Sequence, residues 1–210
     1  MSKRGETKKR IIEEARLTFN ALRYGRVTTA SLAKKLGLAE GNLWYHFKTK
    51  RELLAVIQAD FITDTQALLV SGEPDEDPIE AYCVFLKAWR DLFSRYLFVF
   101  RDRADYGAHS PELIEVFPKL YGLLDARVAH LFGSLAKEGL LPIRNDEIPD
   151  LAFNTVLITR YYFEFQAERL SVTDGSLNAG PDAAVLQHQT LFGSSIGAEI
   201  IERSREMLDK

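Results

Sequence analysis

SLAKKLGLAEGNLWYHF, residues 31–47, contains two short helical patterns separated by one glycine. The first pattern has apolar residues at helical spacing, with the small residue Ala33 among them, and Gly37 follows as a typical helix stop. The second pattern has room for only about two helical turns, and it places Leu43 and Phe47 four residues apart on one helix face. Two short helices joined by a tight turn with a glycine predict a helix-turn-helix motif.

The second helix of this motif has more rings than one buried face can hold. Residues 44–47 are Trp, Tyr, His and Phe, and consecutive residues of a helix or a strand do not share a face. With Leu43 and Phe47 packed inward, we expect Asn42 and residues 44–46 to point outward. Indole, phenol and imidazole groups that face outward suit a groove lined by phosphates.

Charge is distributed unevenly along the chain. Residues 1–50 carry 12 Lys and Arg against 4 Asp and Glu, whereas the other 160 residues carry 15 against 26, for a net charge of −3. This asymmetry favours contact between the N-terminal part and a polyanion. An unevenly charged, solvated surface is the alternative explanation.

Beyond the motif, the apolar spacing is helical and predicts an all-α protein. We expect a long helix over 51–70, and then a break at the acidic, proline-containing stretch GEPDEDP, residues 72–78. Later helices are predicted over residues 79–108, 111–137, about 147–169 and about 182–207. The predicted domains are a helix-turn-helix domain over 1–50 and a helical ligand-binding and dimerisation domain over 51–210, connected by the helix over 51–70.

The stretch GNLWYHFKTKRELL, residues 41–54, combines an aromatic pair, His and Phe with a following Lys and a new helix rich in Leu. In this pattern, residues 8–55 resemble the DNA-binding domain of the TetR family of bacterial transcriptional regulators. The resemblance implies that two threonines meet a phosphate, that three residues at the start of the second helix reach base edges, and that the rings and a lysine contact the backbone. The residues so implied are Thr28, Thr29, Glu40, Gly41, Asn42, Trp44, Tyr45, His46 and Lys50.

The resemblance also implies a function, a ligand-responsive regulator that recognises a specific DNA sequence. Such a protein is most often a repressor, which a small apolar or aromatic effector releases from a pseudo-palindromic operator. Its partners would be a double-stranded DNA operator, an effector of unknown identity and a second copy of the chain. The alternative is a helical small-molecule carrier or an enzyme with a vestigial helix-turn-helix, and DNA binding distinguishes the two.

Two sets of residues in the helical domain are candidate sites. Three aromatic residues each offer one hydrogen-bonding group within an apolar wall, which suits a small ligand; they are Trp89, Tyr121 and Tyr162. The stretch FGSSIGAEI, residues 192–200, combines small residues with apolar ones and favours close packing of the last two helices in a homodimer. The candidate dimer contacts are Phe192, Ile196 and Ile200.

Other classes of protein find little support in the sequence. No apolar run approaches the roughly 20 residues that span a bilayer, so we expect no membrane partner. The single cysteine, Cys83, lies in an apolar run and fits a buried, inert thiol in the reducing cytoplasm. No spacing of His or acidic residues suggests a metal or catalytic site, and we expect no cofactor and no enzymatic activity.

Overall fold

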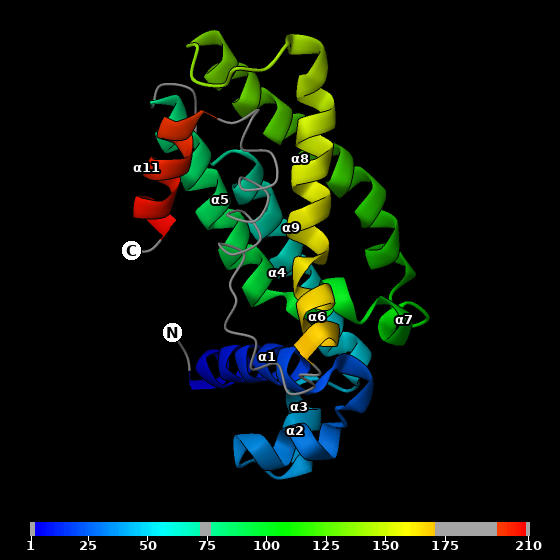
Figure 1. Ribbon diagram of the computed structural model, residues 1–210. Helices are drawn as coiled ribbons and strands as arrows, with labels where there is room; N and C mark the ends of the chain where they lie inside the picture. Colours follow the sequence, from blue (N-terminus) through cyan, green and yellow to red (C-terminus); the bar gives the residue numbers. More distant parts are fainter. Residues whose placement is uncertain (1–2, 72–76, 171–196, 209–210) are drawn as a thin grey trace. The chain divides into compact units, whose positions relative to one another are not determined.

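The computed structural model describes residues 3–71, 77–170 and 197–208, and every regular element in these ranges is a helix (Figure 1). The all-α prediction is therefore confirmed. None of the described helices is long and apolar enough to cross a membrane. In chain order the elements are α1 (Lys3–Leu22), the 3-10 turn η1 (Tyr24–Arg26), α2 (Thr29–Leu36), α3 (Glu40–His46), α4 (Lys50–Leu69), α5 (Pro78–Arg95), α6 (Leu97–Arg101), α7 (Arg103–Tyr106), α8 (Pro111–Lys137), the 3-10 turn η2 (Asn145–Glu147), α9 (Ile148–Leu170) and α11 (Ala198–Leu208).

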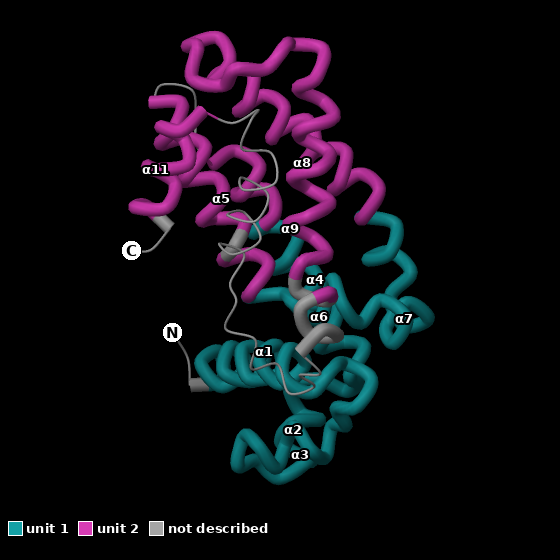
Figure 2. Tube along the Cα trace, viewed as in Figure 1, with its two compact units in different colours: residues 1–64, 95–116 teal, residues 65–94, 117–210 magenta. Residues whose placement is uncertain are grey.

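The chain divides into two compact units that do not follow chain order (Figure 2). They are residues 1–64 with 95–116 (unit 1) and residues 65–94 with 117–210 (unit 2). The predicted boundary at residue 50 ends at the helix-turn-helix, but unit 1 also includes most of α4 and all of α6 and α7. A segment from the middle of the sequence thus completes the N-terminal unit.

Aromatic side chains from α1, α4 and α6 fill the core of unit 1. Phe19, Phe61 and Phe98 are fully buried, and Phe100 is nearly so. The ring centroids of Phe19 and Phe98 lie 5.2 Å apart, and those of Phe61 and Phe100 lie 5.6 Å apart, both edge to face. Aromatic pairs in this geometry stabilise a core beyond the area that they bury. Helix α6 therefore belongs to the same core as α1 and α4.

The stretch predicted as one helix over 79–108 forms three helices, α5, α6 and α7. The first break lies at Tyr96, and a side chain of α1 bonds to both sides of it. Asn20 Nδ2 donates to the carbonyl oxygen of Arg95 at 3.0 Å, and Asn20 Oδ1 accepts from the backbone N–H of Phe98 at 2.9 Å. These bonds satisfy backbone groups that the helix ends leave without partners. Helical periodicity did not reveal the break because apolar residues continue through it.

Helices α5, α8, α9 and α11 supply the core of unit 2. The rings of Tyr82 and Phe132 lie 5.6 Å apart and join α5 to α8. Cys83 is buried, with its Sγ 3.5 Å from Ser204 Oγ of α11, and burial raises the pKa of the thiol. This environment agrees with the predicted inert thiol.

The predicted end of the helix over 111–137 is also confirmed, because Gly139 has a left-handed φ of 73° just after α8.

Candidate nucleic-acid interface

Local signals in the sequence set the two ends of α2. The side-chain oxygen of Thr28 accepts the backbone N–H of Ser31 at 3.1 Å, and Ser31 Oγ accepts the backbone N–H of Thr28 at 3.0 Å. This reciprocal capping box satisfies two backbone donors at the start of the helix. At the other end, Gly37 has a φ of 65°, and the backbone N–H of Leu38 donates to Ala33 O at 2.9 Å. The helix-turn-helix is therefore formed as predicted.

Helix α3 buries one face and exposes the others. Leu43 and Phe47 are each only 2% exposed, as their spacing predicts. On the remaining faces Trp44 is 41% exposed and Tyr45 is 65% exposed, and the side chain of Asn42 is exposed as well. The rings of Trp44 and Tyr45 and the amide of Asn42 therefore make few contacts that bury them within the chain. The structure thus leaves this surface available for a partner.

Two contacts hold the polar residues of this surface in place. Thr29 Oγ1 of α2 donates to Glu40 Oε1, the first residue of α3, at 3.3 Å. The half-buried ring of His46 packs edge to face on Tyr45, with the ring centroids 5.4 Å apart. Gly41 between them has nothing within 4 Å of the position that a Cβ would occupy. The fold therefore does not require glycine at position 41.

Lys50, predicted to contact the DNA backbone, also holds the turn that precedes α2. Its ammonium group donates to the carbonyl oxygens of Tyr24 and Val27, the latter at 2.8 Å, and lies 3.8 Å from the centre of the Tyr24 ring. Burial lowers the pKa of the Lys50 ammonium and raises the pKa of Tyr24 to about 12. The start of α4 is thus tied to the segment that leads into the helix-turn-helix.

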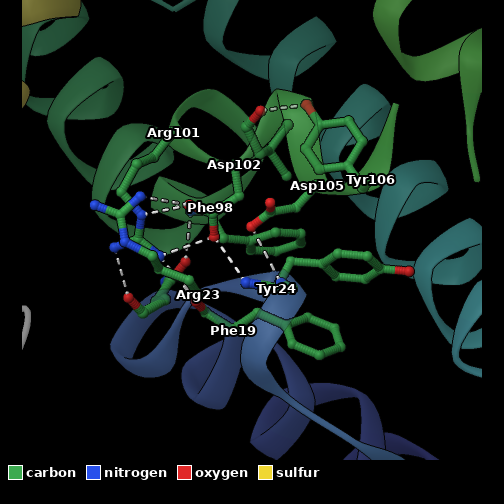
Figure 3. Close-up of polar contacts among 11 residues, drawn as sticks. Phe19, Arg23, Tyr24, Phe98, Arg101, Asp102, Asp105 and Tyr106 are labelled. Carbon is green, nitrogen blue, oxygen red and sulfur yellow. Dashed lines mark hydrogen bonds and ion pairs between the residues drawn. The ribbon is translucent and has the colours of Figure 1, made fainter. Parts of the chain in front are cut away.

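Asp102, between α6 and α7, also binds this turn (Figure 3). Its carboxylate, which has no exposed surface, accepts the backbone N–H of Tyr24 at 2.8 Å. Arg101 donates Nε to it at 2.6 Å, and an Arg23 nitrogen lies 3.7 Å away. Arg23 itself has a φ of 69°, which is uncommon for a residue with a side chain. One buried carboxylate thus fixes the backbone just before α2.

Sequence reasoning missed this role of residues 101–106. They lie more than 70 positions after the turn that they contact, and no local rule predicts such a pairing. The run of charged residues Arg101, Asp102 and Arg103 within an apolar stretch was the one available signal. Charged residues in an apolar stretch are rarely buried without partners.

The candidate ligand residues all belong to unit 2. Trp89 is 2% exposed, and its ring lies 5.7 Å from that of Phe85 on the same helix. The hydroxyl oxygen of Tyr121 accepts a hydrogen bond from Nε of the buried Arg160 at 3.1 Å. Tyr162 is half-buried on α9. Ligand binding by these three residues stays a prediction.

Ile200, one of the predicted dimer contacts, lies in unit 2 and is 1% exposed, and its role in a homodimer stays a prediction. Phe192 and Ile196 lie outside the described residues.

A different apolar surface is exposed on α9, where four large apolar or aromatic residues are spaced four positions apart. We call it the α9 stripe; its exposed fractions are 56% for Phe153, 43% for Leu157, 48% for Tyr161 and 62% for Phe165.

Two family models match the chain. The DNA-binding model of the bacterial regulatory proteins of the tetR family matches residues 11–57, and the TetR model, described as a bacterial transcriptional repressor, matches residues 62–193. The chain belongs to the TetR family. The boundary between the two matched regions falls within α4, and the first region contains the whole helix-turn-helix. The protein is therefore a DNA-binding transcriptional regulator, as the resemblance implied.

Solved structures of two transcriptional regulators and of a receptor share the fold over most of the chain. A TetR-family regulator from Marinobacter aquaeolei has a TM-score of 0.77 at 22% identity, over 99% of this chain and 97% of that one. A gamma-butyrolactone receptor has a TM-score of 0.69 at 11% identity, over 98% of each chain. A transcriptional regulator from Saccharomonospora viridis in complex with choline has a TM-score of 0.64 at 17% identity, over 91% of this chain and 98% of that one. No curated protein sequence matches the chain.

In the described ranges, no three His, Cys, Asp or Glu side chains form a group that would hold a metal ion. The polar clusters that are present, around Asp102 and Lys50, hold backbone segments together instead. Their effect is to position the surface of α3.

Proposed function

We propose that this TetR-family regulator represses transcription by binding a pseudo-palindromic operator as a homodimer, and that a small effector releases it. The observation that supports DNA reading most strongly is the division of α3 into a buried face, with Leu43 and Phe47, and an exposed face, with Asn42, Trp44 and Tyr45. It acts in the cytoplasm, where it meets its DNA, and it is a regulator and not a carrier or an enzyme.

The exposed residues of the motif divide into two roles. Asn42 has an amide that can pair bidentately with adenine in the major groove, so it reads sequence, and Glu40 beside it accepts from cytosine. Thr28, Trp44, Tyr45 and His46 carry side-chain donors that suit phosphate oxygens, and Thr29 can offer its backbone N–H at the start of α2, because its hydroxyl donates to Glu40. These residues set the register of the protein on the duplex. Lys50 supports the turn from within, and its positive charge favours the DNA backbone nearby.

Replacing Asn42 with alanine should relax the preference for one base pair in each half-site. The expected loss is roughly 1–3 kcal/mol of discrimination at that position, because one bidentate contact disappears. Competition binding with duplexes that vary one position at a time measures this effect. Thermal unfolding serves as the control, since Asn42 is exposed; uniform weakening on every duplex would contradict a role in base reading.

Replacing Gly41 with alanine should stabilise the protein and weaken operator binding at the same time. A glycine inside a helix costs about 1 kcal/mol relative to alanine, and a Cβ at position 41 would meet nothing within the chain. A methyl group on the exposed face of α3 would, however, separate the helix from the base edges. The matched control is Gly133→Ala in α8, which also has open space; it should raise the melting temperature without changing DNA affinity. Tighter operator binding by Gly41→Ala would show that close approach at this residue is unimportant.

The α9 stripe is the surface that we assign to the homodimer. Its four side chains are 43–62% exposed and follow one face of a single helix, Ile148–Leu170. Exposed apolar residues that line one helix face mark an interaction site. An isologous contact between two copies of α9 would cover them, in agreement with the expected pairing of the helix over 147–169 with its symmetry mate.

We place the effector site in unit 2, among the aromatic rings of α5, α8 and α9. Among the buried polar atoms of these helices that have no hydrogen-bond partner in the described part of the chain are Thr159 Oγ1 and Asp125 Oδ1. Burial also raises the pKa of the Asp125 carboxyl group. Buried polar groups that lack a partner are uncommon and point to a missing one. An apolar or aromatic effector with one donor group suits this environment.

The proposed function is tested by selecting binding sites from a random pool of duplexes. A homodimer with paired recognition helices should enrich a pseudo-palindrome with half-sites one helical turn apart, about 34–36 Å. Native mass spectrometry of the purified protein, in turn, should detect two chains and any effector that copurifies. Enrichment of no common sequence would exclude sequence-specific regulation.

A further inference from the structure

The first two turns of α1 bring two positive charges to the edge of α3. The guanidinium carbon of Arg4 lies 4.9 Å from the ring centroid of Tyr45, and the ammonium nitrogen of Lys8 lies 5.3 Å from that of Phe47. Arg4 and Lys8 are four positions apart in α1, so they share one helix face and lie about 6 Å apart along the axis. The N-terminal end of α1 therefore borders the DNA-facing helix.

Both charges are exposed, and carboxylates do not neutralise them. In the described ranges, neither Arg4 nor Lys8 forms an ion pair. Of the three acids of α1, Glu13 binds Arg16 and Glu14 lies 2.9 Å from Lys35, and the exposed Glu6, two positions from each of the two cations, does not share their helix face. An exposed cation loses little hydration when it meets a phosphate. The pair thus retains its charge for a polyanion.

We propose that the DNA-binding surface extends from α3 onto the first two turns of α1, where Arg4 and Lys8 bind phosphates of the DNA backbone. This inference rests on the proposed function, because it requires α3 to lie in the groove. Tyr45 is 65% exposed, so DNA that reaches its hydroxyl comes close to the guanidinium group beside its ring. Duplex DNA carries about one negative charge per 1.7 Å of axis, and a phosphate is therefore available to each cation.

Arg4 also has a positioning role. A guanidinium plane over an aromatic face limits the directions in which the tyrosine ring turns. The Tyr45 hydroxyl is then presented to the backbone in a narrower range of positions. Lysine at position 4 would keep the charge but would stack less well, so the two roles of Arg4 are separable.

The alternative is that these cations only pack α1 against α3. In that case their removal would lower thermal stability and leave the salt dependence of DNA binding as it is. Phosphate contacts behave differently, because each one releases counterions. Each contact steepens the slope of log K against log salt concentration by about 0.9. Salt dependence therefore separates the two explanations.

The experiment compares the full-length wild type with Arg4→Ala, Lys8→Ala and Arg4→Lys on a random-sequence duplex and on a selected operator. Lys119→Ala, an exposed lysine of α8 in unit 2, is the control for the change in net charge. In a homodimer, each alanine variant removes two contacts, so the slope should flatten by about 1.8, and affinity near 0.15 M salt should fall roughly 30-fold on both duplexes. Arg4→Lys should have the same slope as the wild type. The melting temperatures of all three variants should stay close to that of the wild type.

Each other outcome has a distinct meaning. If the alanine variants retain the slope of the wild type and of Lys119→Ala, Arg4 and Lys8 do not contact DNA and the inference is overturned. If affinity falls only together with the melting temperature, and the slope is unchanged, the contacts are structural and the inference is also overturned. If the wild type itself binds neither duplex in a salt-dependent way, the proposed function fails first.

Discussion

Replacing Asp102 with alanine should lower the free energy of unfolding of unit 1 by about 3–5 kcal/mol, as expected when one partner of a buried ion pair is removed. The Asp102 carboxylate is fully buried, and three groups depend on it: the Tyr24 backbone N–H at 2.8 Å, the Arg101 guanidinium at 2.6 Å and the positive charge of Arg23 at 3.7 Å. Without the carboxylate, the buried N–H of Tyr24 loses its partner, and the half-buried Arg101 guanidinium keeps only the carbonyl oxygens of Phe19 and Asn20. Urea denaturation, with hydrogen exchange of the peptides that cover α1 and α6, measures the loss.

Two matched variants identify the cause. Asp105, three residues later, is exposed and accepts from the backbone N–H of Gly25 at 3.3 Å in the same turn; its replacement by alanine should cost under about 1 kcal/mol. Asp102→Asn keeps an oxygen for the Tyr24 N–H but loses the charge, so its effect should be intermediate. If Asp102→Ala and Asp105→Ala were equally stable, the buried carboxylate would not be what holds the turn before α2.

Replacing Leu157 with glutamate should convert the homodimer into a monomer and reduce operator affinity about 10²- to 10⁴-fold. Leu157 lies in the middle of the α9 stripe, where a charge would be buried against its symmetry copy without a partner. Separated domains lose the effective concentration that lets the second half-site bind after the first. Light scattering measures the mass, and titration of a full operator measures the affinity.

The control variant places a glutamate at an exposed apolar residue outside the α9 stripe. Val70 is 60% exposed at the end of α4, and Val70→Glu should leave both the dimer and the affinity unchanged. Binding of Leu157→Glu to an isolated half-site should match that of the wild type, because α3 is unaffected. A dimeric Leu157→Glu protein would exclude the α9 stripe as the interface.

The sequence predicted those parts of the interface that depend on neighbours along the chain. The threonine cap of α2, the left-handed Gly37 and the i, i+4 pair of Leu43 and Phe47 are local features with one physical solution each. Together they define which side of α3 is buried, and the exposure of Trp44 and Tyr45 follows. The nine residues implied by the family pattern all lie in or next to this motif.

The remaining features depend on pairings between distant residues. Asp102 meets Tyr24 across 78 positions, and hydrophobic periodicity contains no information about which segments meet. The same limit applies to Ile200, whose spacing predicts an apolar face on the last helix without identifying the segment that covers this face; its role in a homodimer stays a prediction. Lys50 differs from both. The family pattern predicts that it contacts DNA, and in the fold its ammonium group donates to the backbone of the turn before α2.

We propose that this TetR-family protein reads a DNA sequence through α3. The most direct test is titration of the wild-type protein, at physiological salt, on the duplex from its own promoter region and on a shuffled duplex of the same composition. Specific regulators bind their sites at least about 10³-fold more tightly than other DNA, and we expect a ratio of that size, with part of it lost at one base pair in Asn42→Ala. Equal affinity for the promoter and the shuffled duplex would contradict sequence-specific DNA binding through α3.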